Sequence, residues 1–209
     1  MKRIYLIALA AILLTTAVSA QRPVRFRNET VDTTRITTAL IELDKKKKPM
    51  PQLLVSEAGK MFISTPYAAG TLEESPEMLT VDTEHLDCTT FVEMATAMAI
   101  TVANRRTSWR DYVYNLQQLR YRGGNVDGYA SRLHYISDWI VNNFHRGNIR
   151  EITPEIDGAR YDVKTLDFMS KHRDSYLQLA DSAMWAKVKN FEIGYRMHRY
   201  PYLKKEWLD

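Results

Sequence analysis

The segment over residues 87–99 constrains the fold of this chain more than any other stretch. Its apolar residues recur at steps of three and four: Phe91, Val92, Ala95, Met98 and Ala99. That spacing is typical of a helix that buries one face. The sequence therefore predicts a core helix here, with Cys88 in its first turn.

Helical spacing of apolar residues also predicts helices, the last two of them with breaks, over residues 36–43, 53–62, 111–120, 162–179 and 183–195. Ser131 is placed to cap one further helix, which Gly147 would end. Residues 78–81 are expected to form a short strand or an extended segment, and the C-terminal end shows no return to a sheet. The chain is therefore expected to be mainly helical.

The first twenty residues have the character of a secretory signal peptide. A short basic start is followed by an apolar run and by small residues at Ala17-Val18-Ser19-Ala20. We expect cleavage after Ala20, an exported protein in the periplasm or outside the cell, and no membrane segment afterwards. Residues 21–34 are polar and are expected to form an irregular leader.

The charge of the chain argues against nucleic acid as a partner. The formal net charge is +4, and loss of Lys2 and Arg3 with the signal peptide leaves +2. Nucleic-acid binding draws most of its affinity from a strongly basic surface. The composition offers no such surface, and the sequence leaves the oligomeric state open.

Cys88 is the only cysteine, so no intramolecular disulfide can form. A lone thiol in an oxidising compartment is either buried and inert or kept for its reactivity. The N-terminus of a helix stabilises a thiolate, because unpaired backbone amides face it. The amide of Cys88 could also donate to an oxyanion, as amides do in acyl transfer. The spacing alone leaves both interpretations open.

The residues around Cys88 resemble a known motif. Asp87-Cys88, a small polar residue and Phe91-Val92 resemble the Asp-Cys-Ser-Gly-Leu-Val type of sequence in the NlpC family of bacterial cell-wall cysteine peptidases, a papain-like group. Upstream, Thr65-Pro66-Tyr67 with Gly70 resembles the Pro-Tyr element of that family, whose tyrosine stands beside the nucleophile.

A closer resemblance covers residues 35–209. Four motifs occur in the order found in the N-acetylmuramoyl-L-alanine amidase-like branch, known as domain of unknown function family number 1460. They are residues 65–73, residues 86–93, residues 131–135 with Asp138-Trp139, and residues 168–170 with His172.

This resemblance implies an α+β, mainly helical fold: the helical subdomain of a papain-like hydrolase whose β-barrel is missing or minimal. It implies hydrolysis of a peptidoglycan amide through an acyl-enzyme on Cys88, without a cofactor. The bond is either the muramoyl to L-alanine bond or one within the stem peptide. By position, Tyr67 supports the oxyanion or the substrate, and Asp87 orients the turn beside the substrate.

The catalytic histidine of the family lies on a strand of the barrel, in a His-Thr-Gly-Ile-like run that this sequence lacks. We therefore expect the domain over residues 35–209 to be incomplete. His134 and Asp138 stand four residues apart on the predicted helix, and they are either a base with its orienting group or a structural pair. His85, three residues before Cys88, is a weaker alternative as the base.

Arg132, Tyr135, Asp138 and Trp139 form a polar and aromatic group that is either a wall of the substrate cleft or a structural cluster. Zinc is not expected, since no Cys-x-x-Cys or His-x-x-x-His spacing is present. The rival to an enzyme is a non-catalytic protein that binds peptidoglycan or muropeptides, or an inactive fragment without its histidine.

Overall fold

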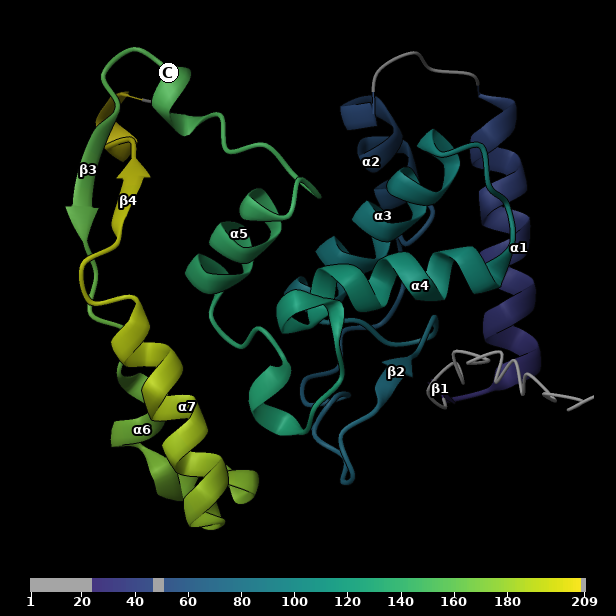
Figure 1. The fold of residues 1–209 in the computed structure, drawn as a ribbon. Helices are drawn as coiled ribbons and strands as arrows, with labels where there is room; N and C mark the ends of the chain where they lie inside the picture. Colours follow the sequence, from purple (N-terminus) through teal and green to yellow (C-terminus); the bar gives the residue numbers. More distant parts are fainter. Residues whose placement is uncertain (1–23, 47–50, 208–209) are drawn as a thin grey trace, which may run out of the picture.

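The computed structural model describes residues 24–46 and 51–207, and the fold is mainly helical (Figure 1). Its helices are α1 Glu29–Lys45, α2 Pro51–Lys60, α3 Cys88–Ala103, α4 Trp109–Arg120, α5 Ile136–His145, α6 Phe168–Lys171 and α7 Ser182–Gly194. Its strands are β1 Val24–Phe26, β2 Leu79–Val81, β3 Arg160–Val163 and β4 Arg199–Tyr202. The expected signal peptide lies outside the described residues. Among the helices of the described part, none combines the length and apolar character needed to cross a membrane.

Two small sheets connect distant parts of the chain. β1 pairs in parallel with β2, with Val24 opposite Leu79. β3 pairs antiparallel with β4, with Tyr161 opposite Pro201. The expectation that the C-terminal end does not return to a sheet is therefore wrong. Pro201 is tolerated because both strands of a two-stranded sheet are edge strands, where a missing N–H breaks no central ladder.

The irregular leader expected over residues 21–34 is also wrong from residue 24 onward, because this stretch contains β1 and the first turns of α1. Asn28 caps α1 by accepting a hydrogen bond from the amide of Val31 at 3.2 Å. Asp32 is fully buried and accepts hydrogen bonds from the amide and hydroxyl of Thr83, at 2.8 and 2.6 Å. Polar residues that suggest a solvated leader are thus bonded inside the fold.

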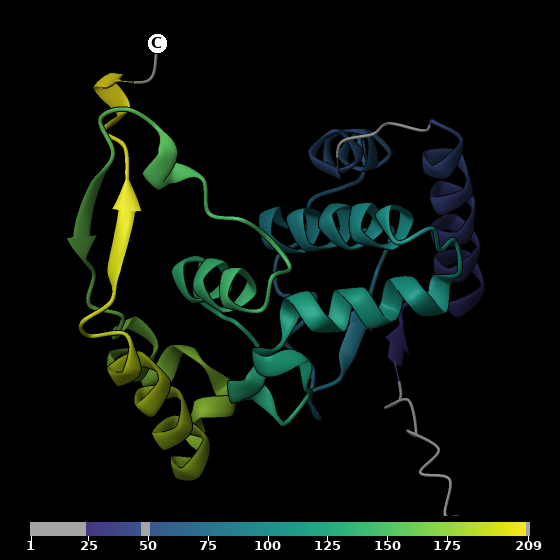
Figure 2. The same ribbon diagram turned by 45° about the horizontal axis from the view of Figure 1, so that its top comes forward.

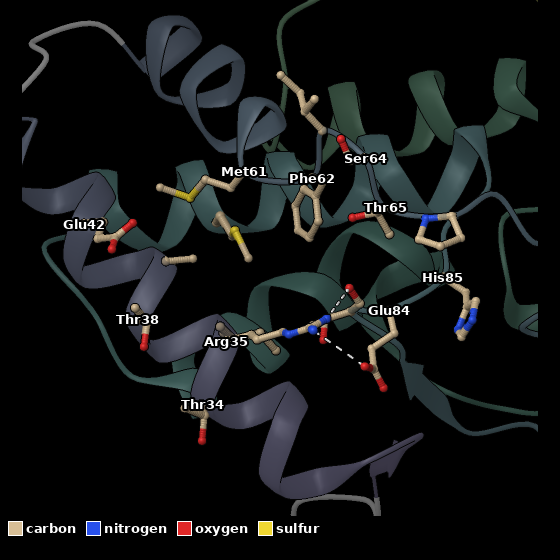
Figure 3. A pocket seen from close by; sticks show the side chains of 16 residues that line it. Thr34, Arg35, Thr38, Glu42, Met61, Phe62, Ser64, Thr65, Glu84 and His85 are labelled. Carbon is tan, nitrogen blue, oxygen red and sulfur yellow. Dashed lines mark hydrogen bonds and ion pairs between the residues drawn. The ribbon is translucent and has the colours of Figure 1, made fainter.

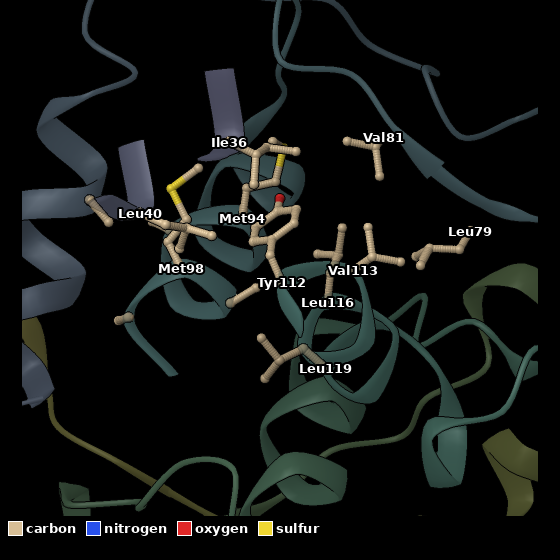
Figure 4. Close-up of a cluster of buried hydrophobic side chains, with 14 of the residues drawn as sticks. Ile36, Leu40, Leu79, Val81, Met94, Met98, Tyr112, Val113, Leu116 and Leu119 are labelled. Carbon is tan, nitrogen blue, oxygen red and sulfur yellow. The ribbon is translucent and has the colours of Figure 1, made fainter. Parts of the chain in front are cut away.

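The larger core lies between α1, α2, α3 and α4. Figure 4 shows its side chains from α1, β2, α3 and α4. Helix α3 is the centre of this core. Cys88 lies in the first turn, as predicted, and is the first residue of the helix. The face predicted to be buried is partly wrong, because Phe91 and Val92 are 38% and 46% exposed. Phe91 lies at the edge of the core, in edge-to-face contact with Phe62 at 6.2 Å between ring centroids. The buried face is shifted along the helix to Met94, Ala95, Ala97, Met98, Ala99 and Val102.

The fifth helix begins later than predicted. α5 starts at Ile136, with Tyr135 as its N-cap residue. Ser131 does not cap it, because the Ser131 hydroxyl donates to the carbonyl of Gly128 and accepts from the amide of Asp127, at 2.7 and 2.8 Å. These bonds close a tight turn before the helix.

A second, smaller core joins the C-terminal part of the chain to residues just before α5. It contains Tyr129, Ala130, Met169, Leu179 and Val188. Residues 162–179, expected to be a broken helix, contain only α6 and two short 3-10 turns after the end of β3. Two views show α5 between the N-terminal helices and the C-terminal pair α6 and α7 (Figures 1 and 2).

Candidate functional site

A reciprocal cap fixes the position of Cys88. The carboxylate of Asp87 accepts a hydrogen bond from the amide of Thr90 at 2.7 Å, and the Thr90 hydroxyl accepts from the amide of Asp87 at 2.8 Å. This is a capping box, which satisfies two backbone donors and sets the first helical residue. Asp87 therefore orients the turn, and Cys88 is the first residue of a 16-residue helix.

The thiol of Cys88 is free and exposed. Its one polar contact among the described residues is with the hydroxyl of Thr89, at 4.0 Å from Sγ. Within the same residues, the backbone amides of Cys88 and Thr89 donate to no acceptor, as expected for the first turn of a helix. An exposed thiol beside unpaired amides can attack a carbonyl whose developing oxyanion those amides stabilise.

The Pro-Tyr element lies beside the chain segment that leads into Cys88. The amide of Ala68 donates to the carbonyl of Leu86, and the amide of Leu86 donates to the carbonyl of Pro66, both at 3.1 Å. Tyr67 is thereby paired with Leu86, two residues before Cys88, and its side chain is 73% exposed. The structure brings two sequence-predicted residues, Tyr67 and Cys88, to neighbouring chain segments.

His134 and Asp138 do not form the predicted pair. His134 precedes α5, and its Nε2 donates to the carbonyl of Tyr129 at 2.8 Å. Desolvation inside the protein, with the Arg132 guanidinium acting in the same direction, lowers the pKa of His134 to about 3. The helical spacing of residues 134 and 138 does not apply, because the helix starts only at Ile136.

Asp138 and Tyr135 instead join α5 to the C-terminal part. The carboxylate of Asp138, which is 2% exposed, accepts hydrogen bonds from the Arg122 guanidinium and the Tyr195 hydroxyl. The hydroxyl of Tyr135 donates to the carboxylate of Glu192 at 2.6 Å. Both side chains were predicted to belong to a cleft wall or to a structural cluster. Their polar groups are hydrogen-bonded to other side chains of the protein.

Arg132 and Trp139 are buried as well. The guanidinium of Arg132 donates to the carbonyl of Leu72 at 2.9 Å and to the carboxylate of Glu73 at 2.7 Å. It holds the loop before β2 against the rest of the fold. Trp139 belongs to the larger core. The contacts that the structure gives these two side chains are therefore also internal.

A histidine with a carboxylate partner lies closer to Cys88 in the sequence. Nδ1 of His85 lies 3.3 Å from Oδ2 of Asp82, while Oδ1 of Asp82 accepts the amides of Glu84 and His85 at 2.8 and 2.9 Å. Asp82 is buried and the side chain of His85 is half exposed. Sequence reasoning considered His85 but missed Asp82. The signal in the sequence was the Asp-x-x-His spacing of residues 82 and 85. In such a turn the aspartate can accept hydrogen bonds from the backbone amides that follow it.

No trio of histidine, cysteine, aspartate or glutamate side chains within residues 24–46 and 51–207 is arranged to hold a metal ion. The candidate site consists of the Cys88 thiol, the amides beside it and the neighbouring Pro-Tyr segment.

Comparison with solved structures identifies similar proteins. An N-acetylmuramoyl-L-alanine amidase from Bacteroides uniformis is 34% identical, with a TM-score of 0.71 over 75% of this chain and 66% of the amidase. A candidate xylanase from Bacteroides fragilis is 38% identical, with a TM-score of 0.66 over 71% of this chain and 65% of that protein. A Legionella pneumophila protein of domain of unknown function family 1460 is 20% identical, with a TM-score of 0.54 over 84% of this chain and 65% of that protein. This last likeness shows the fold alone.

The chain thus spans 65% to 66% of the length of these solved relatives. No curated protein matches it. The family model described as AmiA-like, N-acetylmuramoyl-L-alanine amidase-like, matches residues 57–208. This range includes Tyr67 and Cys88 and covers more than half of the sequence. The chain therefore belongs to the N-acetylmuramoyl-L-alanine amidase-like family.

Proposed function

We propose that the chain is an exported, papain-like hydrolase of peptidoglycan amides, with Cys88 as its nucleophile. The observation that carries the proposal is the exposed thiol at the first residue of the capped helix α3. Free cysteines are usually buried, so exposure at a helix N-terminus favours a reactive role over packing. Membership of the amidase-like family supports an amide as the bond that is cut.

The reaction follows from the groups around the thiol. The Cys88 thiolate adds to the carbonyl carbon of the amide, and the unpaired amides of Cys88 and Thr89 stabilise the oxyanion. The amine leaves after it takes up a proton, and a thioester to Cys88 remains. Water then adds to the thioester, which releases the carboxylic acid and restores the thiol. Tyr67, on the segment beside Leu86, supports the oxyanion or the substrate.

This chemistry needs a base that takes the proton of the thiol. No histidine among the described residues is hydrogen-bonded to Sγ of Cys88. His134, which the sequence offers either as a base or as part of a structural pair, has its Nε2 bonded to the carbonyl of Tyr129. His85 carries a carboxylate partner, Asp82, as the base of a catalytic triad does. Separate His85→Ala and His134→Ala variants test both residues, and the true base is the one whose loss abolishes turnover.

No histidine within residues 24–46 and 51–207 is hydrogen-bonded to the Cys88 thiol. This favours a second candidate, a protein that binds muropeptides without cutting them. Both functions include binding to peptidoglycan fragments. They differ in whether the amide is cleaved and whether Cys88 is unusually reactive, so a single preparation can separate them.

The experiment incubates the purified chain with a disaccharide tripeptide muropeptide and follows the products by mass spectrometry. The proposal expects either free disaccharide and intact peptide, or a shortened stem peptide, and no product with Cys88→Ala. It also expects a thiol-directed acylating probe to label Cys88 faster than free cysteine near neutral pH. Intact muropeptide with labelling no faster than free cysteine would overturn the enzyme in favour of the binding protein. Xylan is the control substrate, and its cleavage would contradict the amide assignment.

A further inference from the structure

A groove of about 710 Å³ lies between helix α1 and the segment that connects α2 to the Pro-Tyr element (Figure 3). One wall comes from α1, and the other from residues 61–66 and 83–85. Figure 3 shows Arg35, Thr38 and Glu42 on the α1 wall, opposite the segment that carries Phe62 and Thr65. A groove of this volume is in the range that takes a small ligand or a short peptide.

The lining of the groove combines an apolar floor with polar walls. Ile36, Phe62 and Met98 are buried and contribute the floor. The hydroxyls of Thr38 and Thr65 belong to opposite walls. Such a surface suits a ligand with short apolar side chains and a backbone rich in hydrogen-bonding groups, as a peptide has.

Charges of opposite sign stand along the α1 wall. The side chain of Arg35 is 54% exposed, and its contacts with the described residues are long: 3.4 Å to the carbonyl of Thr83 and 3.6 Å to the carboxylate of Glu84. The guanidinium therefore keeps donors for a further carboxylate. Glu42 is exposed and has no ion pair within residues 24–46 and 51–207. It lies seven residues further along α1, a rise of about 10 Å.

The groove reaches the candidate catalytic segment. Its lining includes Pro66 and His85. The carbonyl of Pro66 accepts from the amide of Leu86, and Leu86 is two residues before Cys88. A ligand that lies in the groove therefore ends close to the chain segments that carry Tyr67 and the thiol.

We propose that this groove binds the stem peptide of the substrate, with Arg35 pairing with a carboxylate and Glu42 with an ammonium group. The inference rests on the proposed function and adds the part of the substrate that is recognised. A stem peptide offers the free carboxylate of its γ-linked D-glutamate and the side-chain amine of the diamino acid that follows. The 10 Å between residues 35 and 42 corresponds to about three residues of extended chain, which these two groups can span.

The test measures binding in the Cys88→Ala chain, so that cleavage plays no part. The probe is the tripeptide L-Ala-γ-D-Glu-diaminopimelate, titrated calorimetrically. Arg35→Gln should weaken its binding by about tenfold or more, since a charge-assisted, bidentate pair is lost. Arg106→Gln, which changes an exposed arginine outside the groove, is the matched control and should leave the affinity unchanged.

A modified probe tests the second contact. Acetylation of the side-chain amine of the tripeptide should weaken its binding to the Cys88→Ala chain with an unchanged groove by about tenfold. This is the change expected for one lost ion pair in a partly desolvated site. The Glu42→Gln variant should bind both peptides with equal affinity. Circular dichroism of each variant checks that the fold is intact.

Equal affinities of Arg35→Gln and Arg106→Gln, or no binding of the tripeptide, would overturn the groove assignment. Neither result concerns the thiol, whose role is decided by the cleavage assay. Conversely, a chain that binds the tripeptide through Arg35 without cutting muropeptides would refute the hydrolase and keep the peptide groove.

Discussion

The N-terminal region, residues 24–126, and the C-terminal region, residues 160–207, bury their apolar side chains in clusters of very different size. The N-terminal region, with parts of residues 133–140, shares a core of 23 buried apolar residues. The C-terminal region shares a cluster of five with the turn before α5. At about 25 cal/mol per Å² of buried apolar surface, the larger cluster dominates the stability of the whole molecule. The helix that carries Cys88 lies in the larger core, so the thiol is held by the more stable region.

The C-terminal region depends instead on polar contacts across α5. Asp138 bonds to Arg122 and Tyr195, and Glu192 bonds to Tyr135. Cation–π contacts add to this, such as the Arg122 guanidinium over the Phe191 ring at 3.9 Å. Because the apolar cluster beside these contacts is small, loss of one of them should release the C-terminal region while the N-terminal core remains folded.

The largest effect is expected from the ion pair inside the N-terminal region. Nε of Arg120 lies 2.6 Å from the carboxylate of Glu93, and the side chains are 1% and 2% exposed. Glu93→Ala leaves the arginine charge buried and unpaired, so it should lower the free energy of unfolding by about 3–5 kcal/mol. Urea denaturation followed by circular dichroism measures the loss.

The control for this variant is Asp44→Ala, an exposed carboxylate on α1, with an expected change within about 0.5 kcal/mol. Because Glu93 is on α3, its loss should unfold both regions together. If the N-terminal region alone became unprotected in Glu93→Ala, the proposed order of stability would be reversed.

A smaller and local effect is expected from Asp138→Asn. The substitution keeps the size of the side chain and removes the charge that Arg122 faces. Loss of a charge-assisted hydrogen bond should cost about 2–3 kcal/mol. Hydrogen exchange should become faster in α7 and in β3–β4, while α3 keeps its protection. Asp157→Asn, an exposed aspartate in the loop just before β3, is the control. Equal loss of protection in α3 would refute two separately stable regions.

The features that sequence analysis predicted correctly are those set by neighbouring residues. The start of α3 at Cys88 follows from Asp87 and Thr90, three residues apart, and from a helical apolar pattern. The family resemblance places Tyr67 beside the nucleophile, which spacing alone could not suggest. The structure pairs Tyr67 with Leu86, two residues before Cys88.

The features that sequence analysis missed depend on partners far along the chain. Asp32 is buried because Thr83, 51 residues later, donates to it. Asp138 has its partner Tyr195 57 residues away. β4 exists only because β3 pairs with it, and its proline conceals the strand in the sequence. Position within a helical pattern gives no information on such contacts, so His134 and Asp138 were paired with each other incorrectly.

The smallest expected effect concerns pH. His134 packs on Tyr129 of the smaller cluster, at 4.3 Å between ring centroids, and its pKa of about 3 lies below the unfolded value near 6.5. Between these values the unfolded chain binds a proton that the folded chain does not. The stability is therefore complete above about pH 6.5 and falls as the pH decreases toward 3. By pH 5.5 the loss from this histidine should be about 1 kcal/mol.

Since His134 lies at the boundary of the smaller cluster, this acid sensitivity belongs to the C-terminal region. His134→Gln should remove the corresponding part of the pH dependence, with His145→Gln, a histidine exposed at the end of α5, as the matched control. The measurement is hydrogen exchange of α7 and α3 at pH 7 and pH 5.5, corrected for the intrinsic rates. We expect α7 to lose more protection than α3 at pH 5.5, and His134→Gln to abolish this difference. That result would show that acid destabilises the C-terminal region before helix α3, which carries Cys88. Equal losses in both helices would mean that protonation of His134 destabilises the whole fold. The two regions would then unfold as one unit.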